Sequence, residues 1–292
     1  NVSVDGGTIK LDGNYPVGSN NVALGNNALS SGSLSGANNT AIGREAMLSN
    51  TSGALNVALG STTLDANTTG SSNTAVGQAA LGSNTTASSN TAVGYQSLLA
   101  NTTGSSNVAV GTNALQSNTT GGANTALGHR SLLLNTTGSE ITALGNHALH
   151  QNSTGSYNVS SGTYSLYSNT TGANNTANGY RALFSNTTAS DSTAVGYQSL
   201  YSNTTGSVNT AVGFKAGYAN TTGIVIDAFG YQTLDANTTG ERNAAFGAAS
   251  LGDNTTGSYN IAVGNNALAQ NTTADYNTAV GYQAGYSNTT GS

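Results

Sequence analysis

Residues 73–77 read Asn-Thr-Ala-Val-Gly, and the same five residues recur at 90–94. A variant of this motif follows at 107–111. Its glycine then returns every seventeen residues as far as Gly281, and the same spacing extends backwards to Gly43. An unstructured low-complexity chain would drift in register, so this constant spacing predicts a folded repeat protein.

The repeat belongs to a chain of unusual composition. Charged residues make up 6% of the 292 residues, against about a quarter in an ordinary globular protein, and there are 39 glycines. Such a bias is also typical of disorder, but the strict period argues against it. The chain has no cysteine, so stability has to come from backbone pairing and packing rather than from disulfides.

Several classes of function find no support in these residues. The six Lys and Arg are scattered singly in a chain of net charge −5, whereas nucleic-acid binding needs clustered basic residues. No apolar run approaches the roughly 18 residues of a membrane span. The three His and the scattered acids form no catalytic set and no metal-ligand spacing. We therefore expect a protein without enzymatic activity, cofactor, metal, nucleic-acid partner or membrane span in this segment.

The length of the repeat selects the fold class. Seventeen residues are too few for a helix-pair repeat, which needs about 33. They suit one coil of a parallel β-solenoid with two or three short strands. The Val or Leu before each glycine favours a strand, and the Asn-Thr-Thr-Gly segment is typical of a turn, with left-handed Asn and positive φ at Gly. We predict an all-β chain of about sixteen coils.

Alternation along a strand decides which residues face inward. Ala75 and Val76 are neighbours, so they should point to opposite faces. The small Ala suits the narrow interior, which leaves the pre-glycine row outside as an apolar stripe, and such a stripe marks an interface. We predict self-association, with three chains around one axis. The alternative is a corner that places both rows inside a monomeric core. The predicted inter-chain row is Val76, Val93, Val110, Leu127, Leu144, Val195, Val212, Val263 and Val280.

Two pairs of adjacent coils interrupt this row. Ser161 and Asn178 would place polar groups on the axis, where a water or an anion could satisfy them. Phe229 and Phe246 would widen the bundle locally.

An asparagine recurs seven residues after nearly every repeated glycine. Each Asn-Thr-Thr fits the acceptor pattern for N-glycosylation, but stacked amides that bond one another along the axis would give the same regularity. We favour a ladder of amides and keep glycosylation as the alternative. The residues are Asn67, Asn84, Asn101, Asn118, Asn135, Asn169, Asn186 and Asn203.

Two further rows suggest contact functions. The adjacent threonines after each asparagine raise an ice-binding alternative, although neighbours such as Thr102 and Thr103 should point to opposite sides. Tyrosines recur just after the glycine, as at Tyr95 and Tyr197, and would either bind sugar or protein or cover an apolar corner of the coil.

The repeated Asn-Thr-Ala-Val-Gly, followed by Ala-Leu, resembles the Ser-Val-Ala-Ile-Gly repeats in the head domains of trimeric autotransporter adhesins. Similar repeats occur in bacteriophage tail fibres. The resemblance covers residues 21–292 and implies a left-handed parallel β-roll of three chains. The adhesin repeat is usually shorter, at about fourteen residues. Here Thr often replaces its Val, as at Thr74, so the coil shape and the binding partner do not carry over directly.

These observations define the expected organisation. Residues 1–20 lack the repeat and should cap the first coil or join a preceding domain, while 21–292 form the solenoid of a longer chain. We expect an extracellular fibre shaft or adhesin segment, on a cell-surface appendage or a virion, that is a homotrimer and contacts a host glycan or protein. A self-assembling filament subunit and an ice-binding solenoid are the alternatives.

Overall fold

The computed structural model describes residues 20–291, in two units that divide between Thr137 and Gly138. Every strand has three residues, with Ala or Ser in the middle. The first unit contains β1 (Val22–Leu24), β2 (Thr40–Ile42), β3 (Val57–Leu59), β4 (Thr74–Val76), β5 (Thr91–Val93), β6 (Val108–Val110) and β7 (Thr125–Leu127). The second contains β8 (Thr142–Leu144), β9 (Val159–Ser161), β10 (Thr176–Asn178), β11 (Thr193–Val195), β12 (Thr210–Val212), β13 (Asp227–Phe229), β14 (Ala244–Phe246), β15 (Ile261–Val263) and β16 (Thr278–Val280).

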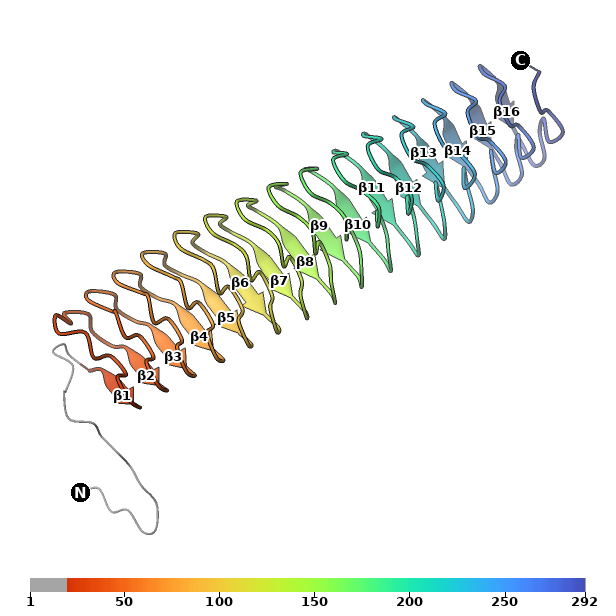
Figure 1. Cartoon of the computed structure of the whole chain (residues 1–292). Coiled ribbons are helices and arrows are strands. Elements are labelled where there is room, and N and C mark those ends of the chain that lie inside the picture. Colours follow the sequence, from red (N-terminus) through yellow and green to blue (C-terminus); the bar gives the residue numbers. More distant parts are fainter. Residues whose placement is uncertain (1–19, 292) are drawn as a thin grey trace, which may run out of the picture. The chain divides into compact units, whose positions relative to one another are not determined.

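Within each unit the strands form a parallel sheet in sequence order (Figure 1). Equivalent residues of successive coils are partners, so that Ala75 pairs with Ala92, and Ala194 with Ala211. This is the predicted parallel β-solenoid with coils of about seventeen residues. Each coil has one strand, however, where the sequence suggested two or three.

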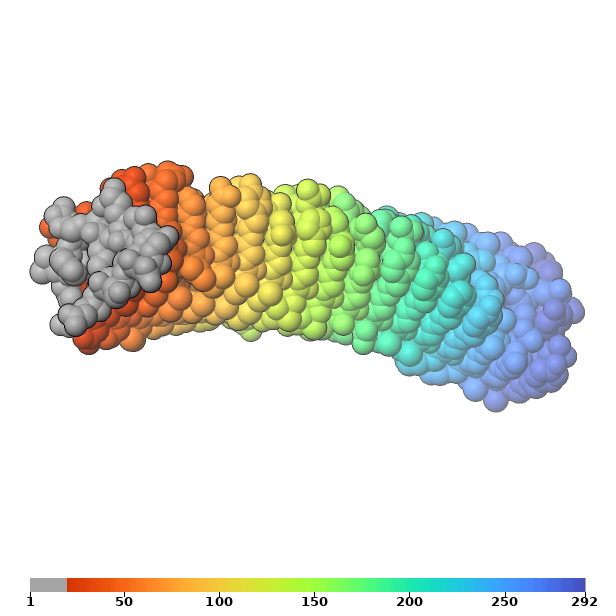
Figure 2. All heavy atoms as spheres, turned by 90° about the horizontal axis from the view of Figure 1, so that it is seen from below, coloured from red at the N-terminus to blue at the C-terminus, as the bar shows by residue number. Residues whose placement is uncertain are grey.

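The rest of each coil is also bonded to its neighbours. In the coil of Gly94, Leu98 N–H donates to the Ala114 carbonyl of the following coil (3.0 Å), and Gln96 N–H to Gln78 of the preceding one (3.0 Å). Such bonds satisfy the backbone groups that a short strand leaves unpaired. On the face seen in Figure 2, successive coils of each unit lie in direct contact.

The interior of each coil is narrow and filled by small residues and leucine. Ala75, in the middle of β4, and Leu81, four residues after the repeated glycine, are both fully buried. The residue before that leucine is also buried and small, such as Ala80. The Ala and Leu rows therefore form the core, as their regularity suggests.

The backbone turns at positions that the sequence did not predict. Asn67 and Gly70 of an Asn-Thr-Thr-Gly segment are not among the residues with positive φ, so the expected turn chemistry there is wrong. Positive φ occurs instead at residues such as Gln96 (54°), Leu98 (51°) and Ser106 (63°). These conformations are unfavourable for side chains with a Cβ, so the hydrogen bonds between coils must hold them.

One departure from the repeat is compensated in the next coil. Gly217 stands where most coils carry the core leucine, and its φ of 61° is the left-handed value of that row. A Cβ at Gly217 would lie 3.0 Å from Cδ2 of Leu200 in the preceding coil and 3.5 Å from Cδ1 of Ile226. Ile226 is fully buried and replaces an asparagine of the repeat. The larger apolar side chain thus fills space that the missing leucine leaves.

The predicted N-terminal cap, residues 1–20, lies outside the described residues except for Asn20.

Candidate interaction surfaces

The outward side of the strands forms an apolar surface on the first unit. From β2 onward the middle residue of each strand is buried, while the first and third residues are partly or largely exposed; in β1 the middle residue, Ala23, is only partly buried. We call these two outward rows the strand face. Val57, Leu59, Val110 and Leu127 are between 37% and 45% exposed. The pre-glycine row therefore lies outside the coil, and not in a corner beside the alanine row.

In β1–β7 the strand face consists of Val, Leu, Ile and Thr alone. A surface of this kind extends over seven successive coils without a charged side chain. Isolated exposed apolar residues are normal, but a contiguous apolar patch marks an interaction site.

The second unit has a more varied strand face. Its third strand residues include Ser161 and the exposed Asn178, which are neighbours across β9 and β10. The rings of Phe229 and Phe246 stack with centroids 5.0 Å apart. Asp227 adds a carboxylate to the first row. Leu144, Val195, Val212, Val263 and Val280 continue the pre-glycine row on β8, β11, β12, β15 and β16.

The asparagines seven residues after the glycine form a continuous column of amides in each unit. Nδ2 of Asn101 donates to Oδ1 of Asn84 (2.9 Å) and to the Gly104 carbonyl (2.9 Å), and Asn118 donates to Oδ1 of Asn101 (2.8 Å). These side chains are fully buried. A glycan on Nδ2 would need space and the loss of these bonds, so the geometry favours a ladder over glycosylation. The same amide-to-amide bond, at 2.8–3.1 Å, begins at Asn67, Asn84, Asn135, Asn169, Asn186 and Asn203.

A second asparagine row, at the start of the repeated motif, was missed by the sequence analysis. Asn90 N–H donates to Oδ1 of Asn73 (3.0 Å), and Asn90 Nδ2 donates to the Gly104 carbonyl (3.0 Å). Gly104 therefore accepts amide protons from Asn90 and from Asn101. The signal was present in the sequence, because this Asn recurs in most coils and is interrupted only by Ile141, Ser192 and Ile226.

Replacing Asn101 with Leu should open the coils around it. The change leaves Asn84 Oδ1 buried without its donor and removes one acceptor from Asn118, at a cost of about 2–4 kcal/mol. Hydrogen exchange of the amides of residues 84–118 measures this as a lower free energy of local opening. Thr103→Leu, at an exposed position of the same coil, should change it by less than about 0.5 kcal/mol. Equal protection in the two variants would show that the amide column contributes nothing.

The two threonine rows do not share a surface. Thr102 is half-buried, and its hydroxyl donates to the Thr119 carbonyl of the next coil (3.0 Å). Thr103 is exposed. The first row thus links coils, and only the second offers hydroxyl groups to solvent.

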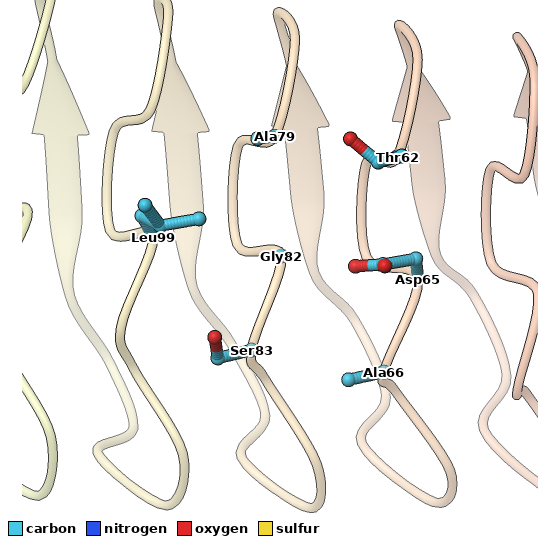
Figure 3. Close-up of a pocket in the computed structure, with 7 residues that line it drawn as sticks. All are labelled: Thr62, Asp65, Ala66, Ala79, Gly82, Ser83 and Leu99. Carbon is cyan, nitrogen blue, oxygen red and sulfur yellow. The ribbon is translucent and has the colours of Figure 1, made fainter.

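A shallow notch interrupts the first unit where Gly82 follows Asp65 one coil later. Thr62, Asp65 and Gly82 lie around it, with Ala66, Ala79, Ser83 and Leu99 completing the lining. In Figure 3 the Asp65 carboxylate points toward the coil of Gly82. Burial raises the pKa of the Asp65 carboxyl above its usual value, backbone hydrogen bonds oppose this, and Glu45 adds to the rise. Thr62 and Ser83 add hydroxyl groups to this lining, which contains no histidine, lysine or second acid that could activate them.

Other reactive side chains are few. In residues 20–291 no three His, Asp or Glu side chains come together in a way that could hold a metal ion. His147 and His150 stack on each other with ring centroids 5.1 Å apart, and His150 stacks on Tyr167 at 5.0 Å. The described part of the chain also contains no helix with the length and hydropathy of a membrane span.

Comparison with known proteins gave no match to a family model, to a curated protein or to a solved structure.

Proposed function

We propose that this chain is a non-enzymatic structural solenoid, the shaft of an extracellular fibre, in which three copies associate along their strand faces. The observation that carries the proposal is the uncharged strand face of β1–β7. Covering this face would remove an apolar stripe from water, which is favourable at about 25 cal/mol per Å².

The best partner for such a face is another copy of the same chain. Its side chains recur at the spacing of stacked strands, about 4.8 Å, so a partner can match it over many coils only if it has the same repeat. A threefold arrangement lets each pre-glycine side chain meet its equivalent from two other copies at one height. Ser161 and Asn178 would then bond across the axis or to a water or anion held there.

The role as an extracellular shaft rests on the properties of the repeat. Backbone bonds join each coil to the next around its circumference, which gives a stiff element that resists local opening. The repeated motif also resembles those of adhesin heads and phage fibres. The same surface rows would give multivalent contact with a host glycan or protein.

Cross-linking tests the proposed arrangement directly, because the chain has no cysteine of its own. In a Val93→Cys variant, three copies in register would bring the introduced thiols together. A short bis-maleimide should therefore link chains into covalent pairs at low protein concentration. It suits the test better than a disulfide, which requires Cα atoms within about 7 Å.

The matched control is Thr103→Cys, an exposed position in the same unit that lies off the strand face. It should remain unlinked under the same conditions. Absence of linked pairs from Val93→Cys, or equal linking at both positions, would refute association through the strand face.

A further inference from the structure

The second unit carries two columns of stacked aromatic rings. The first column is Tyr180, Tyr197, Phe214 and Tyr231, and the second is Tyr167, Phe184, Tyr201 and Tyr218. Neighbouring ring centroids lie 5.2–5.4 Å apart, and their planes differ by no more than 17°. The rings thus stack from coil to coil.

Basic side chains lie between the two columns. The Arg181 guanidinium carbon is 5.1 Å from the ring centre of Tyr180 and 5.4 Å from that of Phe184. Lys215 Nζ is 5.6 Å from the ring centre of Phe214 and 5.1 Å from that of Tyr218. Arg181 and Lys215 occupy the same position in coils two apart, and Gln198 holds it in the coil between. We call these residues and both columns the basic aromatic strip.

The exposed part of the strip is suited to negative charge. Because the rings cover one another's faces, the solvent meets mainly ring edges and tyrosine hydroxyls. Ring edges carry the positive part of the aromatic quadrupole. Tyr197 and Phe214 are 44% and 39% exposed, so these edges are accessible. A neutral sugar that needs an open ring face finds little of one along the columns.

The two cations have unused capacity to bind an anion. Nε of Arg181 is buried without a hydrogen-bond partner. Among the described residues, the ion pairs join Arg44 to Glu45 and Arg242 to Glu241, and neither involves Arg181 or Lys215. Burial raises the pKa of the Asp235 carboxyl, and Asp253 adds to the rise, while a backbone hydrogen bond and nearby Lys215 oppose it. A ligand carboxylate at Lys215 would therefore compete with Asp235.

The distance between Arg181 and Lys215 matches some polyanions better than others. Positions two coils apart are separated by about 9.6 Å, twice the distance between stacked strands. Side chains on one side of an extended peptide recur at about 6.6–6.8 Å and fall out of step with this spacing. In an extended β-1,4-linked glycan, one sugar spans roughly one coil and alternate sugars face the same way. Carboxylates on alternate sugars can then reach Arg181 and Lys215 together.

We propose that the basic aromatic strip binds an extended acidic polysaccharide, a polyuronate, with its carboxylates on Arg181 and Lys215. The hydroxyls of the exposed tyrosines of the first column, Tyr180, Tyr197 and Tyr231, would bond the sugar hydroxyls between them. The strip lies outside the strand face, so this binding and the proposed assembly can fail independently.

Calorimetric titration of the full chain with size-defined β-1,4-mannuronate oligomers tests the proposal. The double variant Arg181→Gln, Lys215→Gln should weaken binding by at least about ten-fold, because it removes both charge-assisted contacts. Arg130→Gln with Arg242→Gln removes the same charge elsewhere and should change affinity by less than about two-fold. Arg130 is a close match, since it occupies the coil position of Arg181 without the aromatic columns.

Two further ligands test whether binding depends on the carboxylates and on their spacing along the chain. Neutral cello-oligosaccharides have the same extended form without carboxylates, and polyglutamate has the charge with peptide spacing; both should bind at least about ten-fold more weakly. Circular dichroism melting checks that each variant is folded. If the double variant does not fold, the affinity of Lys215→Gln alone for the mannuronate oligomers takes its place in the comparison. Equal losses in the two double variants, equal binding of polyglutamate, or no binding of mannuronate would each overturn the proposal.

Discussion

Gly94→Ala should open the coils of Gly94 and Gly111, with a loss of about 3 kcal/mol or more in the free energy of local opening. Gly94 has a φ of 132°, which residues with a side chain rarely adopt. A Cβ there would lie 2.6 Å from the Gly111 carbonyl oxygen of the next coil. The backbone would have to move away from the following coil on that side, which also breaks the bond from Gly111 N–H to the Val93 carbonyl.

Two other glycine variants show whether φ or crowding decides this loss. Gly104→Ala would place its Cβ even closer to backbone, 2.2 Å from the Gly121 carbonyl oxygen, but Gly104 is not among the residues with positive φ. The chain itself carries Ala87 at that position of the repeat. We therefore expect Gly104→Ala to cost less than Gly94→Ala. Gly32→Ala has no atom within 4 Å of the new Cβ and should be nearly neutral.

Hydrogen exchange measured by mass spectrometry, peptide by peptide, ranks the three variants. A single denaturation midpoint would be less informative, because repeat proteins can open coil by coil. The reverse order for Gly94→Ala and Gly104→Ala would mean that crowding, and not the backbone conformation, makes the repeated glycine necessary.

The parts of the fold that depend on side-chain period could be predicted from the sequence. Ala75 and Val76 have opposite environments because neighbours in a strand must. Leu81 is buried with its row, as a regular apolar position suggests. The outward direction of the pre-glycine row follows from the same alternation.

The turns could not be predicted, because they contradict local preference. Leu98 has a φ of 51°, an arrangement that no propensity favours for leucine. It is held because Leu98 N–H bonds the following coil while the side chain is buried in the core. The conformation therefore depends on contacts between stacked coils, and the sequence of a single coil does not reveal these contacts.

The surfaces likewise include some features that the sequence predicts and others that only the folded coils show. The amide column could be inferred from the regular spacing of residues such as Asn84 and Asn101. The convergence of two asparagine rows on the Gly104 carbonyl required the folded coil. The basic aromatic strip could not be predicted either. In the sequence, Arg181 and Phe184 are isolated substitutions in the repeat, and they lie beside the other members of the strip only when the coils stack.

The strand face should lose its capacity to assemble when it is charged. In Val93→Asp with Val110→Asp, carboxylates from every copy would meet in the apolar interface, where burying an unpaired charge costs several kcal/mol. The proposed three-chain assembly should then dissociate to single chains. Thr103→Asp with Thr120→Asp places the same two charges one coil apart on exposed positions off the strand face, and should leave assembly unchanged.

The most direct measurement is the solution mass of the full chain by light scattering, beside these two double variants. Our account predicts a mass of three chains for the unmodified protein and for the threonine variant, and of one chain of 28.8 kDa for the valine variant. An open-ended distribution of masses would indicate the filament alternative. An unmodified protein with the mass of one chain, or a valine variant that keeps the mass of three, would contradict the assembly proposed for the strand face.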